Sequence, residues 1–251
     1  MLISDGDGKI AMNNNIIYFT IALIASSVGS LLGIGGGIII VPALLSAGIT
    51  KELVSANSSL TVFTMAAISS FIYIRRKQGD IKTALFVAMG SIPGSYLGVF
   101  LNYRISTKMF NILFAFLLIL LLILMFLKNR LPNINLGNVS KVFLGLFIGI
   151  LSGLFGIGGG PITVPLLLSF FGFQGKTVSA TSIYITMITA LFSVLSNIFA
   201  GNKNLSLAIF MIPGAIIGAK IGTYLNKKAG EKTLNIIFNC LLIYLLIRQF
   251  V

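Results

Sequence analysis

The chain has no histidine, no tryptophan, one cysteine and only five acidic residues among 251. It therefore lacks the residues that build ordinary metal sites and the side chains that most often act as general acids and bases. The single cysteine, Cys240, excludes an intrachain disulfide. We expect no bound metal, no cofactor and no enzymatic activity.

Charged residues make up only 9% of the chain, whereas hydrophobic residues make up 57%. Apolar runs of about 20 residues, the length that spans a bilayer, recur along almost the whole sequence. A net charge of +13 would suggest nucleic acid as the partner of a soluble protein. Here the basic residues lie mostly in short loops between apolar runs, where they set topology and meet anionic lipid headgroups. We predict an all-α polytopic protein of the lipid bilayer that binds no nucleic acid.

One unusual motif occurs twice. Residues 33–37 read Gly-Ile-Gly-Gly-Gly and are followed by Val41-Pro42, and residues 156–160 repeat the motif before Val164-Pro165. Further matches keep the same order in both halves: Val54–Ser58 with Val178–Ser182, Ile92–Gly94 with Ile212–Gly214, Asn111-Ile112 with Asn235-Ile236, and Phe114 with Phe238. We predict a polar N-terminal tail (1–15), a first four-segment repeat (16–128), a linker (129–138) and a second repeat (139–251).

Each repeat opens with an apolar stretch that is longer than one span and is interrupted by the glycines. If this stretch is a hairpin that enters and leaves on one side, the two repeats are inverted. If it is a discontinuous helix that crosses the membrane, they are parallel. The hairpin topology gathers more of the Lys and Arg residues on one side, as cytoplasmic loops do. We therefore predict inverted repeats. The sequence does not decide between the two forms of the broken segment, the hairpin and the discontinuous helix.

Three successive glycines disfavour a continuous helix, because glycine is costly in helix interiors and adopts many other conformations. In a bilayer the freed backbone groups are tolerated only inside protein or beside a water-filled cavity. A half-helix that starts after such a break turns its free N–H groups and positive dipole end towards the break, which favours anions. We predict that Gly35, Gly36, Gly37, Gly158, Gly159 and Gly160 bind an anionic substrate, with hinges at Pro42 and Pro165. The alternative is close helix packing, which we assign to glycines repeated every four residues, such as Gly90, Gly94 and Gly98.

A cluster of hydroxyls and amides opens the next segment of each half. Such groups donate hydrogen bonds without a fixed charge, which permits both binding and release. The substrate ligands that we predict from this cluster, which also contains Thr186, are Asn57, Ser58, Ser59, Thr181 and Ser182. The alternative is interhelical hydrogen bonding or helix capping. Lys220, the only charge well inside an apolar segment, is a further candidate ligand, although its long stem could carry the ammonium to the interface.

The paired glycine motifs, the matched Ser/Thr-rich stretches and the Pro-Gly-x₃-Gly motifs at 93–98 and 213–218 together resemble the TauE/SafE family of membrane permeases, over residues 16–250. The resemblance implies export of sulfite or a small organosulfonate across a prokaryotic cytoplasmic (inner) membrane. We predict alternating access between the repeats. The alternatives are an importer or channel for another small anion, and a non-transport membrane assembly protein. The sequence leaves the oligomeric state undefined.

Overall fold

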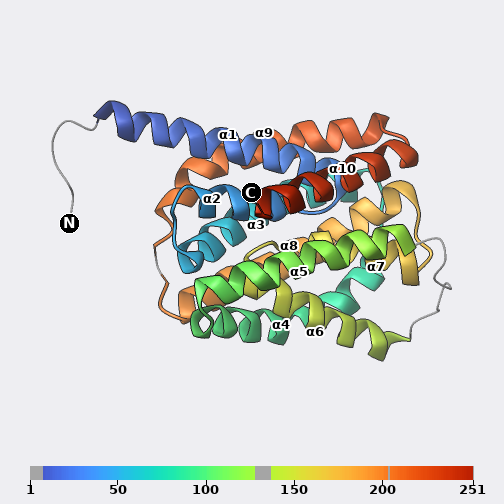
Figure 1. Cartoon of the computed structure of the whole chain (residues 1–251). Helices are drawn as coiled ribbons and strands as arrows, with labels where there is room; N and C mark the ends of the chain where they lie inside the picture. The colour runs from blue at the N-terminus through green and yellow to red at the C-terminus, as the bar shows by residue number, and fades with distance from the viewer. Residues whose placement is uncertain (1–7, 128–136, 203, 251) are drawn as a thin grey trace.

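The computed structural model of the chain describes residues 8–127, 137–202 and 204–250, and these ranges are helical with short connections. The helices are α1 (Gly8–Leu32), α2 (Gly37–Ser46), α3 (Lys51–Arg75), α4 (Ile81–Arg104), α5 (Thr107–Leu127), α6 (Asn138–Phe155), α7 (Gly160–Phe170), α8 (Gly175–Phe199), α9 (Ser206–Lys228) and α10 (Glu231–Phe250) (Figure 1). Helix α1 begins within the predicted tail. Of the predicted linker, residues 129–136 lie outside the described residues.

Seven of the described helices are long and apolar enough to cross a membrane: α1, α3, α4, α5, α6, α8 and α9. Helices α2 and α7 are apolar but shorter, with 10 and 11 residues. Helix α10 carries Glu231, Lys232 and Arg248 near its ends and is not among the seven, although the predicted four-segment repeat over 139–251 would end in a span there. The prediction of an all-α polytopic membrane protein is confirmed.

Two pairs of helices pack with their backbones almost in contact: α4 with α6, and α1 with α9, which lie side by side in Figure 1. Glycines make this possible. A Cβ atom on Gly94 would lie 3.0 Å from the Cα of Gly149, and one on Gly218 would lie 2.5 Å from the carbonyl oxygen of Leu23. Small residues at this spacing let membrane helices approach closely. These glycines therefore serve packing, as their spacing predicted.

Helices α3 and α8 form the centre of the bundle. They contact each other, and α3 also packs on α9 while α8 packs on α4. They are the most enclosed of the spanning helices: 72% of the apolar window of α8 and 56% of that of α3 are buried. Their side chains therefore line the centre of the bundle.

Candidate functional site

Both glycine motifs break their helices. Helix α1 ends at Leu32 and α2 begins at Gly37, while α6 ends at Phe155 and α7 begins at Gly160. Within these breaks, Gly35 and Gly158 both have φ +76°, a region that side-chain-bearing residues rarely enter. The short helices α2 and α7 are the half-helices predicted from the sequence.

The two breaks touch each other through their backbones. A Cβ atom on Gly37 would lie 2.5 Å from the Cα of Ile157, and one on Gly160 would collide with the carbonyl group of Ile34. All these residues are buried. Only glycine allows this approach, so the motifs are needed at the contact itself as well as for the helix break.

Val62 of α3 and Thr186 of α8 enclose the meeting point of the breaks. A Cβ atom on Gly35 would lie 2.9 Å from the methyl carbon of Thr186 and 3.4 Å from a methyl carbon of Val62. One on Gly158 would lie 3.0 Å from the same Thr186 methyl and would collide with Val62. Helices α3 and α8 therefore position the two breaks against each other at the centre of the bundle.

The first break satisfies most of its own backbone amides, and that of Gly36 alone among Gly33–Gly37 makes no hydrogen bond to the described residues. The N–H groups of Gly33, Ile34 and Gly35 all turn back to the carbonyl oxygen of Gly29, at 2.9, 2.9 and 3.4 Å. The N–H group of Gly37 donates to the carbonyl of Gly35. Much of the hydrogen-bonding capacity that the motif frees is thus used within the break.

The second break leaves its amides open. The N–H groups of Gly158, Gly159 and Gly160 make no hydrogen bond within the part of the chain that the structure describes. The amides that follow, those of Ile162 and Thr163, return to the carbonyl of Gly159 at 3.1 and 3.0 Å. Buried backbone N–H groups are rarely unpaired, so three in succession at a helix N-terminus indicate a place for an acceptor.

Hydroxyl groups of α8 stand beside these amides. The Oγ1 atom of Thr186 is buried without a hydrogen-bond partner and lies 2.7 Å from the position that a Cβ atom on Gly160 would take. One turn earlier, Ser182 donates to the carbonyl oxygen of Gly160 at 3.4 Å. Open amides, an unpaired hydroxyl and the positive end of α7 together can bind an anion without a fixed charge.

The serines of α3 lie differently. Ser58 donates to the carbonyl oxygen of Gly156 at 2.8 Å and so reaches across to the second break. Ser59 is fully buried, and its hydroxyl has no partner among the described residues. Of the predicted ligands, the structure therefore brings the six glycines, Ser58 and Ser182 together.

Asn57 and Thr181 point elsewhere. The amide of Asn57 donates to the carbonyl of Asn204 at 3.0 Å and accepts from the N–H of Ala208 at 2.9 Å. Thr181 accepts from the N–H of Asp80 at 2.8 Å. The two side chains thus fasten the start of α9 and the start of α4, and neither bonds to a break.

Lys220 and the two prolines also lie outside the meeting point. Lys220 is exposed on α9. Pro42 and Pro165 lie inside α2 and α7, one turn after each half-helix begins. Thr186 belongs to the hydroxyl cluster seen in the sequence, but nothing there singled it out. The one available signal was that its matched position in the first half is the apolar Val62.

Comparison with known proteins agrees with this architecture. The probable membrane transporter protein YunE of Bacillus subtilis is 31% identical over 257 residues, which cover 91% of this chain and 94% of that protein. A probable membrane transporter protein of Methanocaldococcus jannaschii is 28% identical over 245 residues, covering 90% and 91%. The sulfite exporter TauE/SafE family protein 3 of Arabidopsis thaliana matches a shorter stretch, 28% identical over 93 residues, or 37% of this chain and 20% of that protein.

No solved structure matches the chain. The family model for the sulfite exporter TauE/SafE matches residues 18–248, a range that includes both glycine breaks and, apart from the first residues of α1, the seven candidate spans. The protein is a multi-pass membrane protein that belongs to the sulfite exporter TauE/SafE family of membrane transporters.

Proposed function

We propose that the protein exports a small sulfur-containing anion, sulfite or an organosulfonate, across a prokaryotic cytoplasmic membrane. The observation that carries this proposal is the row of unpaired amides at Gly158–Gly160 beside the unpaired hydroxyl of Thr186. A sulfite or sulfonate group carries several oxygen acceptors on one sulfur atom, so it can use several of these donors at once. The family name and those of the plant relatives point to the same chemistry.

The absence of a fixed positive charge at the site suits a carrier. Neutral donors hold an anion in a low-dielectric site, but they do not trap it as a buried ammonium would. No carboxylate lies within a spanning helix of the described chain beyond its first turn. Export need not be driven by a proton or sodium ion, because each negative charge that leaves a compartment whose interior is about 100 mV negative gains about 2.3 kcal/mol.

We further propose that the two halves are inverted repeats that rock against each other. Their contacts are reciprocal. Asn102 of α4 donates to the carbonyl of Leu154 at the end of α6 (2.6 Å), and Asn226 of α9 donates to that of Leu31 at the end of α1 (2.7 Å). Helix α4 and its counterpart α9 are thus each bonded to the broken helix of the other half. Such an arrangement can alternate between two packings.

In this mechanism the residues have different roles. Gly158, Gly159, Gly160, Ser182 and Thr186 contact the anion. The first break and the α3 serines (Gly35, Gly36, Gly37, Ser58 and Ser59) close the site from the other half. Pro42 and Pro165 act as hinges, because a proline inside a helix removes one backbone hydrogen bond.

The test is the thermal stability of the detergent-purified protein against sulfite, sulfate, thiosulfate, sulfoacetate, phosphate and acetate. A ligand that binds only the folded state raises its stability, by about 2.7 kcal/mol at one hundred times its dissociation constant. We expect sulfite or a sulfonate to stabilise the protein more than acetate. No shift with any of these anions at millimolar concentration would refute the anion site.

Direction is tested in vesicles. Right-side-out proteoliposomes loaded with labelled sulfite should lose it faster than protein-free liposomes, and external unlabelled sulfite should accelerate the loss by exchange. Flux without exchange would identify a channel instead of a carrier.

A further inference from the structure

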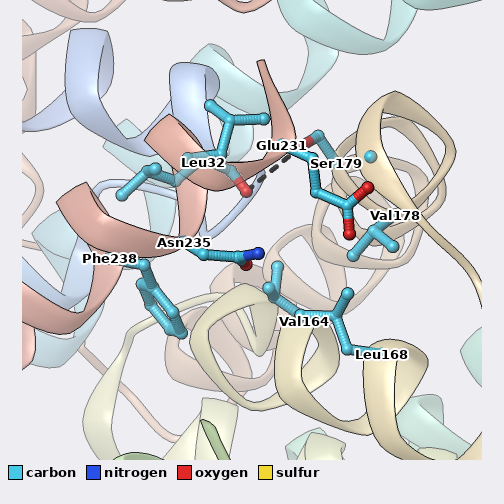
Figure 2. Close-up of a pocket in the computed structure, with 10 residues that line it drawn as sticks. Leu32, Val164, Leu168, Val178, Ser179, Glu231, Asn235 and Phe238 are labelled. Carbon is cyan, nitrogen blue, oxygen red and sulfur yellow. Dashed lines mark hydrogen bonds between the residues drawn. The ribbon is translucent and has the colours of Figure 1, made fainter. Parts of the chain in front are cut away.

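A small pocket lies where α1 ends, between α7, the start of α8 and the start of α10. Its volume is about 20 Å³, which is room for about one water molecule. Figure 2 shows its walls, with Leu32, Val178 and Phe238 around it and the side chains of Glu231 and Asn235 reaching into it. Gly175 completes the lining beside Glu231.

The pocket ends directly beside the first glycine break. Ser179 donates to the carbonyl oxygen of Leu32 at 3.3 Å, the dashed line in Figure 2, and Leu32 is the last residue of α1. A Cβ atom on Gly33, the first residue of the break, would lie 2.5 Å from the Cα of Ser179. The pocket therefore adjoins the start of the first break.

The matching place in the other half is filled with aromatic rings. When the two halves are aligned, Phe155 corresponds to Leu32, Phe110 to Leu234 and Lys51 to Gly175. The Phe155 ring packs edge-on against Phe110 and Phe114, with centroids 5.1 and 5.3 Å apart. All three phenylalanines are fully buried. We call them the aromatic cluster.

The two places lie at opposite ends of the bundle, and these ends differ in charge. At the pocket end, Arg76 donates to the carbonyl of Thr223 (2.8 Å) and Lys176 to that of Lys227 (2.7 Å), so the end of α3, the start of α8 and the end of α9 lie together. The basic residues of this end in the described chain are Arg75, Arg76, Lys77, Lys82, Lys141, Lys176, Lys227, Lys228 and Lys232. At the end that holds the aromatic cluster are Lys51, Arg104, Lys108 and Arg248. The more basic end is the cytoplasmic one by the positive-inside rule.

We propose that the pocket is the cytoplasmic entrance of the solute pathway and that the aromatic cluster is its outer gate, closed in this conformation. The proposal rests on the proposed transport function. An anion enters past Glu231 and Gly175, passes Leu32 and Ser179, and reaches the breaks. Phe155 is the residue directly before Gly156, whose φ is +73°, so rearrangement of the second break on binding the anion moves the Phe155 ring and opens the outer end.

Thiol accessibility tests this pathway without requiring any bound anion. In a Cys240→Ser background, Val178→Cys places a thiol in the pocket wall, and Val54→Cys places one at the matching position near the aromatic cluster. Both valines are buried, at 3% and 0% exposure. Each protein is treated with a membrane-impermeant sulfonatoethyl methanethiosulfonate in inside-out and in right-side-out vesicles. We expect V178C to react from the cytoplasmic side at least tenfold faster than V54C reacts from either side.

A reciprocal pair of substitutions tests whether the phenylalanine rings cause the difference in labelling between the two cysteines. Leu234→Phe gives the pocket the residue found in the other half and should slow labelling of V178C at least tenfold. Phe110→Leu should make V54C reactive from the outside. If the Phe110→Leu protein does not fold, Phe114→Leu is a second substitution that should open the aromatic cluster. Phe116→Leu is the control, because Phe116 is on the same helix but 62% exposed.

Equal labelling of the two cysteines, or no labelling of V178C, would overturn the proposal, as would unchanged rates in the reciprocal variants. Protection of V178C by sulfite is a separate readout. If the labelling pattern holds and sulfite gives no protection, the pathway stands and the sulfite assignment fails.

Discussion

Thr186→Val gives the sharpest test of the proposed site, because the substitution removes a hydroxyl and keeps the shape. The Thr186 hydroxyl is fully buried and has no partner in the described chain. An unsatisfied buried polar group costs about 1–3 kcal/mol, so its removal should leave the free energy of unfolding unchanged or raise it by about 1 kcal/mol. A hydrogen bond to a charged acceptor contributes about 1.5–3 kcal/mol. Anion affinity should therefore fall about 10- to 150-fold.

Thr189→Val is the matched control one turn further along α8. Its hydroxyl is equally buried but donates to the carbonyl of Ile185 at 2.8 Å and bonds to the Ser91 hydroxyl at 2.9 Å. Removing it leaves Ser91 without this bond. We expect a loss of about 1–2 kcal/mol of stability with anion affinity unchanged, the reverse of the Thr186 pattern.

The assays are isothermal titration calorimetry with the stabilising anion and denaturant unfolding of the same purified samples. If Thr186→Val loses stability and keeps its affinity, the hydroxyl is a structural group satisfied by an internal water, and the site is wrongly placed. If both variants lose affinity equally, the effect comes from α8 as a whole and not from the hydroxyl.

Three further outcomes follow from the contacts. Asn57→Ala should lower the free energy of unfolding by about 2 kcal/mol in denaturant titrations, because it leaves the Ala208 amide unpaired. Its anion affinity should be unchanged, and a selective loss of affinity would show that Asn57 belongs to the anion site. Lys220→Gln should leave the KM for transport unchanged, since the side chain is exposed; a tenfold rise would make it a ligand. Gly98→Val should abolish folded protein in fluorescence-detected size-exclusion chromatography, because its Cβ would collide with the Ile150 carbonyl, whereas Gly230→Ala, with no atom within 4 Å, should behave as wild type.

The helix breaks and the packing glycines could be predicted because their cause is local. A run of glycine destabilises a helix wherever it occurs, and the structure ends α1 and α6 directly before the motifs. Glycines spaced by four residues lie on one helix face, and those of α4 do contact α6. In both cases the residue type and its spacing determine the outcome without knowledge of the partner.

The targets of the polar side chains could not be predicted in this way. Asn57 and Ser58 are neighbours, yet successive residues on a helix point about 100° apart. Ser58 reaches the second break, whereas Asn57 reaches the start of α9. Which direction faces the breaks depends on how α3 is rotated against α8 and α9, and that rotation is set by tertiary packing.

The difference between the two breaks coincides with a difference in sequence that lies outside the motif. At the first break, the carbonyl of Gly29 collects three amides, and a Cβ atom on Gly29 would collide with the backbone nitrogen of Gly36. The matched residue before the second break is Ser152, whose carbonyl accepts only the Gly156 amide, at 2.7 Å. The Ser152 hydroxyl bonds to the hydroxyl of Ser193 on α8 at 3.3 Å. The same Gly-Ile-Gly-Gly-Gly sequence thus folds back on the Gly29 carbonyl in one half, whereas in the other half the amides of Gly158, Gly159 and Gly160 make no hydrogen bond within the described residues.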